Sequence, residues 1–371
     1  MGRRFGKTAL GTWLLAEPAL RGRPTAWFAP TYKYLDQVFD RVSQALAPVM
    51  LHRNQQTKWI QLKTGGCIDF WTLDGDDPAR GRKYDTAIID EAAMVPKLRH
   101  QWNAAIRATL TDYQGGAWFL STPKPRSRSD GAAFFGELFD RGQGDGEWMS
   151  WQMPSTTNPF LAASEIEAAR YELPELVFRQ EYGAEFVEFA GGIVKREHLR
   201  YSQPPAGLEI VMGVDLAITT KARSDYTSIA VLGRQQSTGR VWVLSVIRDK
   251  FEFHDVCELI KREAARWNPR VIGIEKIQYQ AAVVQELSRT TTLPVRGVAP
   301  DSDKMTRFMP LASRWERGEV EMVPGITDAF VDELLNFPEV EHDDQIDACS
   351  IAWETLNVFK PGPSATARIR I

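Results

Sequence analysis

The sequence lacks the features of membrane-spanning, secreted and disulfide-stabilised proteins. It has no run of about 18 apolar residues, the length that a membrane-spanning helix needs. Its N-terminus is basic and contains glycine, without the apolar core of a secretory signal. Three isolated cysteines, Cys67, Cys257 and Cys349, follow no metal-binding spacing. We interpret them as reduced thiols of a cytoplasmic protein.

The chain also lacks the overall positive charge of a general nucleic-acid-binding protein. Its net charge is −3 over 371 residues, and the charge is unevenly distributed. Lys and Arg exceed Asp and Glu by six in residues 1–125, whereas the acidic residues are in excess by six in 126–209 and by three in 210–371. Acidic residues that hold divalent cations would not exclude DNA, because the bound cations restore positive charge. The chain is long enough for two domains.

A fragment of a phosphate-binding loop opens the chain. Gly6, Lys7 and Thr8 precede an apolar, helix-like segment, as in the pattern G-x-x-x-x-G-K-[ST], whose backbone N–H groups hold phosphate oxygens. Lys7 would neutralise phosphate charge and Thr8 would hold Mg²⁺. The first glycine of the pattern would fall at Met1, and the strand that delivers such a loop is missing from the sequence. We therefore expect the ATPase activity to be impaired relative to a version extended upstream.

Two later strands of the first half end in polar residues that suit nucleotide hydrolysis. An apolar strand ends in Asp90 and Glu91, where one carboxylate suits the Mg²⁺ shell and the next suits activation of the attacking water. Another strand, 117–120, ends in Ser121 and Thr122, which would sense the γ-phosphate and relay hydrolysis. The structural alternatives are a strand with a solvated acidic end and an ordinary strand-to-loop turn.

The pattern changes twice after residue 125. Residues 126–209 are acidic and rich in turn signals, and we predict an irregular lid and connector there, with two short helices inside it. From residue 210 onward, three antiparallel strands are followed by alternating helices and strands and by a final helix over 344–357. This order of elements is typical of an RNase H-like domain.

Three carboxylate positions interrupt apolar elements of the second half. Asp215 lies in V-M-G-V-D-L-A and Glu275 ends V-I-G-I-E, where a charge requires a partner. In the predicted topology the two strands run side by side, and the final helix brings Asp344 and Asp347 across the same end of the sheet. Like charges this close require cations. Two Mg²⁺ or Mn²⁺ ions there would activate water and stabilise the leaving oxygen of a phosphodiester.

Structural alternatives exist for each of these positions. Asp215 would cap a turn, Glu275 would form a surface pair with Lys276, and Asp343 suits the N-cap of the final helix. The choice between Asp344 and Asp347 as the principal third ligand is open.

Taken together, the motifs resemble the large terminase subunit of tailed bacteriophages, over nearly the whole chain and in the right order. G-R-R-F-G-K-T resembles the Walker A motif of that family, with arginines where glycine is expected. R-G-R-K-Y-D-T-A-I-I-D-E-A-A resembles its Walker B region and F-L-S-T-P-K its coupling motif. N-P-F-L and F-R-Q-E-Y-G-A-E-F are similar to the segment that leads into the nuclease. G-V-D-L-A, G-I-E-K and H-D-D-Q-I-D-A match its three metal-binding positions.

The resemblance implies an α/β protein in which an ASCE-type P-loop ATPase domain precedes an RNase H-like nuclease domain. The expected parts are the ATPase domain, a lid and connector, the nuclease domain and a flexible tail, at 1–150, 151–206, 207–360 and 361–371. ATP and its Mg²⁺ would be bound by Arg3, Arg4, Gly6, Lys7, Thr8 and Asp90. Ser121 and Thr122 would couple hydrolysis to movement. The catalytic residues would be Glu91, Asp215, Glu275 and Asp344, with Asp347 as a further metal ligand.

The same resemblance implies ATP-driven packaging of double-stranded DNA into a procapsid and endonucleolytic cutting of concatemeric DNA. The implied partners are the portal protein, the small terminase subunit and further copies of the chain in a ring, in the cytoplasm of a host bacterium. Two other functions stay open. One is a stand-alone metal-dependent DNA nuclease or resolvase with a degenerate ATPase half. The other is a non-enzymatic assembly protein, which would require both sites to be inactive.

Overall fold

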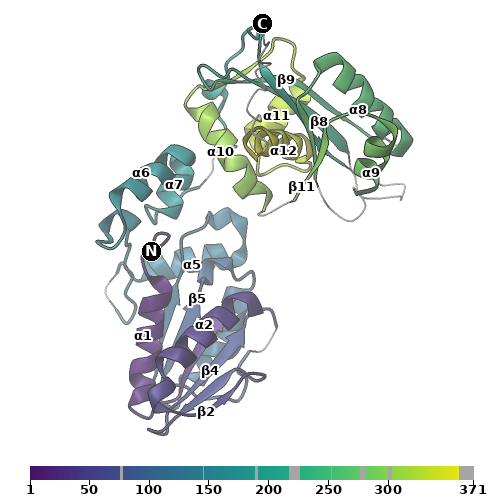
Figure 1. Ribbon diagram of the computed structural model, residues 1–371. Coiled ribbons are helices and arrows are strands. Elements are labelled where there is room, and N and C mark those ends of the chain that lie inside the picture. Colours follow the sequence, from purple (N-terminus) through teal and green to yellow (C-terminus); the bar gives the residue numbers. More distant parts are fainter. Residues whose placement is uncertain are drawn as a thin grey trace, which may run out of the picture. The chain divides into compact units, whose positions relative to one another are not determined.

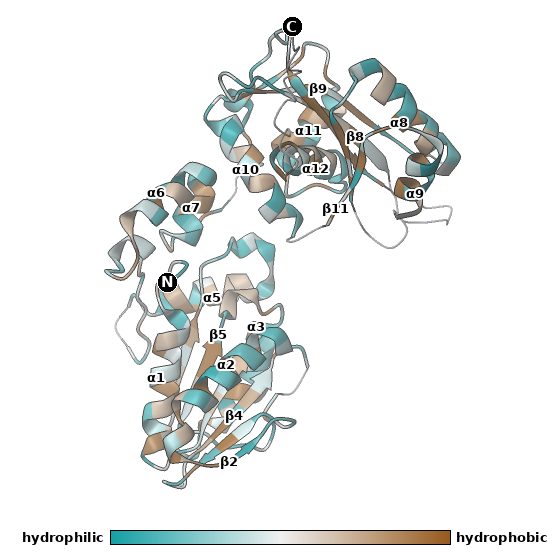
Figure 2. Cartoon of the chain, in the orientation of Figure 1, coloured by the Kyte–Doolittle hydropathy of each residue, from teal (hydrophilic) through white to brown (hydrophobic). Residues whose placement is uncertain are grey.

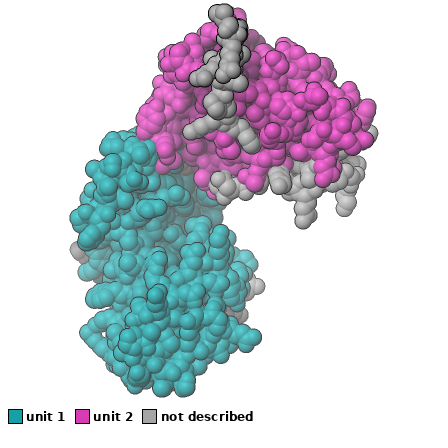
Figure 3. Space-filling view, viewed as in Figure 1, with its two compact units in different colours: residues 1–170, 175–189 teal, residues 171–174, 190–371 magenta. Residues whose placement is uncertain are grey.

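Each half of the chain folds around its own six-stranded sheet (Figure 1). The computed structural model describes residues 1–75, 78–144, 146–188, 191–216, 226–251, 253–275, 281–299 and 303–358. It divides into unit 1, residues 1–170 and 175–189, and unit 2, residues 171–174 and those from 190 onward (Figure 3). The segment 151–206, which we interpreted as a connector, is thus shared between the units. The predicted tail, 361–371, lies outside the described residues.

The sheet of unit 1 has the order β2-β3-β4-β1-β5-β6. Strands β4, β1, β5 and β6 run parallel, and β3 and β2 extend the sheet antiparallel at one edge. The strand bounds are β1 Thr25–Ala29, β2 Met50–Asn54, β3 Trp59–Leu62, β4 Cys67–Thr72, β5 Thr86–Asp90 and β6 Gly116–Leu120. The parallel strands end at one edge of the sheet, and the polar residues after β5 and β6 meet there.

Helices cover both faces of this sheet. The helices before residue 150 are α1 Lys7–Leu20, α2 Tyr32–Ala45, α3 Leu98–Gln101, α4 Arg107–Thr109 and α5 Asp130–Arg141. Helices α6 Ala163–Glu172 and α7 Glu175–Glu181 follow them in the chain. Trp27 of β1 joins one buried cluster with residues of α1 and α2, and Phe28 joins another with residues of α3 and α5. All five residues of β1 are buried, because a parallel strand between two helical layers has no solvated face.

The prediction that residues 126–209 are irregular was wrong for α5, which forms a regular helix of 12 residues. Ser129 caps it by accepting a hydrogen bond from the Ala132 N–H at 3.1 Å. Phe134, Phe135 and Leu138 are buried against the sheet. Turn-rich sequence at both ends of this short apolar stretch concealed the helical spacing. The two short helices predicted inside this segment are confirmed as α6 and α7.

The sheet of unit 2 has the order β11-β10-β7-β8-β9-β12. Strand β8 pairs antiparallel with β7 and β9, whereas β10 pairs parallel with β7 and β11, and β12 pairs parallel with β9. The strand bounds are β7 Glu209–Asp215, β8 Thr227–Arg234, β9 Val241–Asp249, β10 Val271–Glu275, β11 Val295–Val298 and β12 Val320–Met322. These strands confirm the predicted RNase H-like order, and Figure 2 shows their hydrophobic character.

The helices of unit 2 lie on both faces of the sheet (Figure 1). Their bounds are α8 Phe253–Trp267, α9 Ala281–Thr290, α10 Lys304–Glu316, α11 Asp328–Asn336 and α12 Asp344–Val358. Apolar residues of α8 and α9 pack on one face with Met212 and Val214 of β7. Helix α12 packs against β7 and β8. Within the described residues, no helix combines the length and the apolarity that crossing a membrane requires.

Two glycines let α12 lie directly on the sheet. A Cβ at Gly213 of β7 would stand 2.3 Å from the Ala348 carbonyl oxygen and 2.3 Å from the Ala352 nitrogen. A Cβ at Gly273 of β10 would stand 2.0 Å from Thr355 Oγ1. At Gly213 glycine lets the strand backbone approach the helix backbone, and at Gly273 it leaves room for the Thr355 side chain of α12. This contact fixes where the first turn of α12 lies relative to the ends of β7 and β10.

We predict that Gly213→Ala lowers the free energy of unfolding of unit 2 by about 1–3 kcal/mol, because the new methyl group overlaps the α12 backbone. Gly116→Ala is the control, because a Cβ at Gly116 meets no atom within 4 Å. Chemical denaturation followed by tryptophan fluorescence measures both variants. Equal stability of Gly213→Ala and the wild type would show that α12 does not depend on this contact.

Candidate functional site

The centre of the sheet in unit 2 carries two carboxylates side by side. Strand β10 runs parallel to β7, with Ile274 paired to Val214. The next residues, Glu275 and Asp215, are therefore neighbours at the carboxyl ends of their strands. Glu275 is buried and Asp215 is partly buried. The structure confirms the predicted juxtaposition of these two strands.

Helix α12 adds two carboxylates from its first turn. Asp344 and Asp347 stand three residues apart and share a helix face. The side chain of Asp347 is buried. Within the described structure, Asp344 Oδ2 is buried without a hydrogen-bond partner. A buried carboxylate oxygen left in this way is unfavourable unless a cation meets it.

The raised pKa values of Asp215 and Asp347 reflect their burial and the charges of the neighbouring carboxylates. Burial raises the pKa of Asp215 well above its ordinary value, and the charges of Asp347, Glu275 and Asp344 raise it further. Burial also raises the pKa of Asp347 to about 6, although Lys304 opposes the shift. A site in which like charges disfavour each other's ionisation favours cation binding.

Sequence reasoning missed two cations at this cluster, both on α10. The Arg307 guanidinium donates to Glu275 Oε1 at 2.7 Å and to Asp347 Oδ1 at 3.3 Å. The Lys304 ammonium lies 2.6 Å from Asp347 Oδ2 and 2.6 Å from Asp343 Oδ1. The signal in the sequence was the spacing of Lys304 and Arg307, which places both on one face of a helix. Their proximity to the carboxylates depends on tertiary packing, which this spacing does not reveal.

The donor set suits a hard divalent cation. Carboxylate oxygens are the ligands that Mg²⁺ and Mn²⁺ prefer, and the unpartnered oxygen of Asp344 is available to such an ion. In the part of the chain that the structure describes, no three His, Cys, Asp or Glu side chains are already arranged to hold a metal ion. Glu275 and Asp347 are instead turned to Arg307 and Lys304. Both oxygens of Asp347 are engaged, so Asp347 becomes a metal ligand only if one of its ion pairs changes.

The second candidate site lies in unit 1, where the chain begins. Gly6 has φ +112°, a conformation that favours glycine, and α1 starts at the next residue. The Lys7 ammonium donates to the Thr122 hydroxyl at 2.9 Å and lies 4.0 Å from Glu91 Oε1. Three of the predicted elements, the loop, the end of β5 and the end of β6, are therefore brought together at Lys7.

The acidic pair after β5 has two different environments. Burial and the charge of Glu91 raise the pKa of Asp90 to about 7. The Glu91 N–H donates to Asp90 Oδ1 at 3.0 Å. Glu91 adopts φ +46°, which is uncommon for a residue other than glycine and marks a position that its surroundings hold in place.

Ser121 and Thr122 connect β6 to the other parts of this site. The Ala93 N–H donates to Ser121 Oγ at 3.1 Å, which joins the segment after Glu91 to the end of β6. Thr122 accepts from Lys7, as described above. Ser121 and Thr122 thus connect the segment after the acidic pair with the loop lysine.

The two arginines of the loop are held by contacts that the sequence did not reveal. Arg3 Nε donates to Glu181 Oε2 at 2.8 Å, and Lys124 lies 2.6 Å from the other oxygen of Glu181. Arg4 has φ +54°, and its carbonyl oxygen accepts from the Asn158 amide at 2.9 Å. Glu181 lies in the F-R-Q-E-Y-G-A-E-F segment, whose role in anchoring the loop depends on the folded chain.

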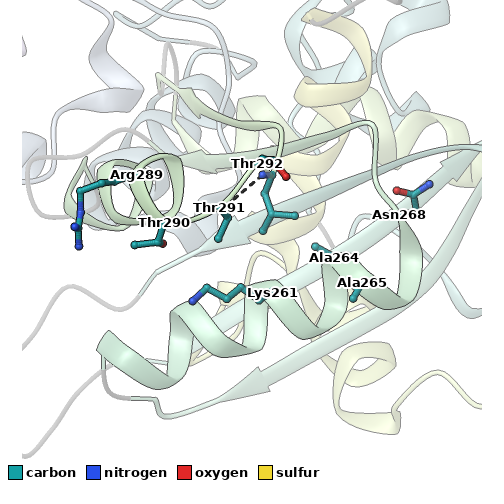
Figure 4. A pocket seen from close by; sticks show the side chains of 9 residues that line it. Lys261, Ala264, Ala265, Asn268, Arg289, Thr290, Thr291 and Thr292 are labelled. Carbon is teal, nitrogen blue, oxygen red and sulfur yellow. Dashed lines mark hydrogen bonds between the residues drawn. The ribbon is translucent and has the colours of Figure 1, made fainter.

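Two pockets lie outside the carboxylate cluster. One, of about 740 Å³, opens between α8 and the end of α9, where Lys261 and Arg289 line it together with three threonines (Figure 4). The other, of about 280 Å³, runs beside β6 and is lined largely by aromatic and methionine side chains, with Met1 at one end. None of the four carboxylates lines either pocket.

Comparisons with known proteins show that the second unit is similar to a family of domains. Residues 212–356 match the model of the Terminase RNaseH-like domain. The large terminase subunit of Escherichia phage T5 is 26% identical over 264 residues, which cover 66% of this chain and 57% of that protein. The large terminase subunit of Thermus virus P23-45 is 30% identical over 235 residues, covering 52% of this chain and 46% of that protein. The chain thus spans about half the length of the curated relatives it matches.

A solved structure shares the fold over almost the whole chain. The large terminase of a thermophilic bacteriophage aligns with a TM-score of 0.58 and 11% identity, over 97% of this chain and 93% of that chain. At this identity the likeness concerns the fold alone. It agrees with the α/β organisation of both units described above.

We predict that Glu181→Gln lowers the free energy of unfolding of unit 1 by about 2 kcal/mol at pH 7, because Arg3 and Lys124 lose a charged partner. Burial raises the pKa of Glu181, but Lys124 and Arg3 outweigh it, and the pKa lies below the ordinary 4.5. The stabilisation is therefore present above pH 4.5 and is lost as the pH falls through the lowered pKa. The difference between Glu181→Gln and the wild type is expected to shrink in that range.

Denaturant titrations at several pH values measure this difference. Glu185→Gln is the matched control, because Glu185 pairs with Arg179 on the more exposed side of the same segment. Its effect is expected to stay within about 0.5 kcal/mol. A Glu181→Gln effect as small as the control would contradict the anchoring role.

Proposed function

We propose that this chain, a relative of the phage large terminase subunits, is an ATP-driven motor for packaging double-stranded DNA that also cuts DNA with a metal-dependent nuclease in unit 2. The observation that carries the proposal is the convergence of carboxylates from β7, β10 and α12 within the region that matches the terminase RNase H-like family. The nucleotide-binding features of unit 1, in the same chain, support the motor function.

For the nuclease, Asp215, Glu275 and Asp344 are proposed as ligands of two Mg²⁺ or Mn²⁺ ions, with Asp347 as a further ligand. Such ions activate water and stabilise the leaving oxygen of a phosphodiester. Asp215 interacts electrostatically with Glu275 of the neighbouring strand and with Asp344 and Asp347 of α12, which suits a shared ligand. The buried, unpartnered oxygen of Asp344 supports its role over that of Asp347, whose two oxygens are both engaged by cations.

For the motor, Gly6, Lys7 and Thr8 are proposed to hold the phosphates of ATP and Mg²⁺ at the start of α1. Asp90 would complete the Mg²⁺ shell and Glu91 would orient the attacking water. The Lys7 ammonium now bonded to Thr122 would turn to phosphate when nucleotide binds.

That exchange is the proposed source of coupling between hydrolysis and movement. Release of Thr122 by Lys7 alters the polar link that runs through Ser121 to the segment after Glu91. Arg3 would contact the γ-phosphate only after leaving Glu181, and Arg4 is a second candidate for that contact. Nucleotide binding would therefore also change the contact between the loop and α7.

The proposed partners follow from the same function. They are double-stranded DNA, the portal protein of a procapsid, a small terminase subunit and further copies of this chain in a ring. The proposed location is the cytoplasm of a host bacterium, with attachment to the procapsid during packaging.

We predict that Asp215→Asn abolishes cleavage of plasmid DNA in Mn²⁺, because a neutral amide cannot replace the central carboxylate of the metal site. Asp249→Asn is the control, because Asp249 ends strand β9 of the same sheet and is exposed. Gel electrophoresis of plasmid after incubation measures the cleavage. Asp215→Asn that cuts at the wild-type rate, or a wild type inactive in both Mg²⁺ and Mn²⁺, would refute the nuclease proposal.

We predict that Lys7→Ala reduces DNA-stimulated ATP hydrolysis by about 100-fold while plasmid cleavage persists, because the lysine acts on phosphate charge in the other unit. Lys33→Ala is the control, since Lys33 is an exposed lysine of α2. Phosphate release measures the rate. ATP hydrolysis by Lys7→Ala at the wild-type rate would refute the assigned role of the loop.

A further inference from the structure

Two cationic side chains lie inside the carboxylate cluster and join the elements that carry it. Arg307 contacts Glu275 of β10 through Nη1 and Asp347 of α12 through Nη2. Lys304, one turn earlier on α10, contacts Asp347 and Asp343. In the absence of a metal ion, these contacts offset the repulsion between carboxylates of a strand and a helix.

The two cations differ in exposure. The side chain of Arg307 is 4% exposed, whereas that of Lys304 is 50% exposed. A buried guanidinium that leaves its partners would remain unpaired away from water, which is strongly unfavourable. An ammonium on a flexible, half-exposed stem can turn into solvent at little cost. Of the two, Lys304 is the one able to exchange.

The difference in exposure between Arg307 and Lys304 affects Asp347, because both cations contact this carboxylate. Its Oδ1 accepts from Arg307 at 3.3 Å, and its Oδ2 lies 2.6 Å from Lys304. Asp344, one turn away, keeps a buried oxygen unpartnered within the described structure. A divalent ion held by Asp215 and Asp344 therefore gains Asp347 as a ligand only when Lys304 releases Oδ2.

The formal charges support an exchange of this kind. Five carboxylates and the cations Lys304 and Arg307 give the cluster a formal charge of −3. The carboxylates are Asp215, Glu275, Asp343, Asp344 and Asp347. One divalent ion brings the cluster to −1, and a second brings it to +1. A second ion is thus favoured when a DNA phosphate contributes its own negative charge.

We infer that Arg307 and Lys304 are resident counter-ions of the metal site: Arg307 is a permanent positioning residue for Glu275 and Asp347, and Lys304 is an exchangeable one that yields Asp347 to an entering divalent cation. The inference rests on the proposed nuclease site. Arg307 and Lys304 would hold the carboxylates of this site together before metal binds, and Lys304 would compete with the metal ion for Asp347.

Calorimetric titration of the full chain with Mn²⁺ tests the competition, with Asp215→Asn as the blank for uptake elsewhere. Lys304→Gln is expected to bind Mn²⁺ about threefold to tenfold more tightly than the wild type, because a competing half-exposed ion pair is gone. Lys261→Gln is the matched control, because Lys261 pairs with Glu258 on α8 at 2.9 Å. Its Mn²⁺ affinity is expected to equal that of the wild type.

An unchanged or weaker affinity of Lys304→Gln would overturn the inference while leaving the metal site in place. Equal Mn²⁺ uptake by the wild type and Asp215→Asn would overturn the metal site itself and the inference with it. The two failures are therefore distinguishable in one set of titrations.

Thermal unfolding with EDTA and with Mn²⁺ tests the role of Arg307. In EDTA, Arg307→Gln is expected to unfold about 5–10 °C below the wild type, and Mn²⁺ is expected to raise its midpoint by more than it raises that of the wild type. Arg307→Lys should restore part of the loss. Arg314→Gln is the control, because Arg314 lies on the same helix and pairs with Glu319 instead.

Arg314→Gln is expected to keep the wild-type response to Mn²⁺ whatever its own stability. If Arg307→Gln shows the same Mn²⁺-dependent rise as the wild type, Arg307 is a structural ion pair only and the inference is overturned. Should Arg307→Gln fail to fold, Arg307→Lys decides. One ammonium replaces only part of the two guanidinium contacts, so Mn²⁺ is expected to raise the midpoint of Arg307→Lys by more than it raises that of the wild type, and an equal rise would contradict the positioning role.

Discussion

Repulsion between carboxylates at the ends of β7 and β10 is the constraint on which unit 2 depends. Asp215 and Glu275 are brought together by the parallel pairing of their strands, and α12 adds Asp344 and Asp347. Hydrophobic packing alone would not assemble these charges, because burial disfavours each of them. The fold resolves the conflict in two ways: glycines fix α12 against the sheet, and cations of α10 face the cluster.

Unit 1 also places a buried acid and a lysine at the end of a strand, but with fewer carboxylates than the cluster of unit 2. Its buried acid, Asp90, again lies at the carboxyl end of a central parallel strand. Lys7, at the start of α1, lies 4.0 Å from the neighbouring acid Glu91 and bonds to Thr122, which follows the adjacent strand β6. The loop that carries Lys7 is anchored through Arg3 to Glu181. In each unit a lysine therefore lies beside the acidic groups of the proposed site and is already bonded to another residue: Lys7 in unit 1 and Lys304 in unit 2.

Much of the architecture was predictable from periodicity. The order of strands and helices predicted from residue 210 onward is confirmed, and the final helix, predicted over 344–357, is α12. Apolar spacing and turn residues both indicated these elements. The approach of Asp215 to Glu275 followed from topology. Helix α5 was missed, since its apolar stretch is short and flanked by turn-rich sequence.

The roles of Arg307, Lys304 and Glu181 were not predictable in the same way. Each is a charged residue on a helix, and its sequence neighbourhood resembles that of an ordinary solvated face. Glu275 lies 32 positions from Arg307, Asp343 lies 39 positions from Lys304, and Arg3 lies 178 positions from Glu181. Only the folded chain brings these partners together. The sequence pattern identified the carboxylates because a charge inside an apolar strand is unusual, whereas a charge on an amphipathic helix is not.

An anomalous difference map from a crystal of the full chain soaked in Mn²⁺ tests whether the carboxylates of β7, β10 and α12 form one divalent-cation site. We expect a Mn²⁺ peak bounded by Asp215 and Asp344, with the Lys304 ammonium moved away from Asp347. A saturated crystal with no peak at these carboxylates, or with Mn²⁺ bound only elsewhere in the chain, would contradict it.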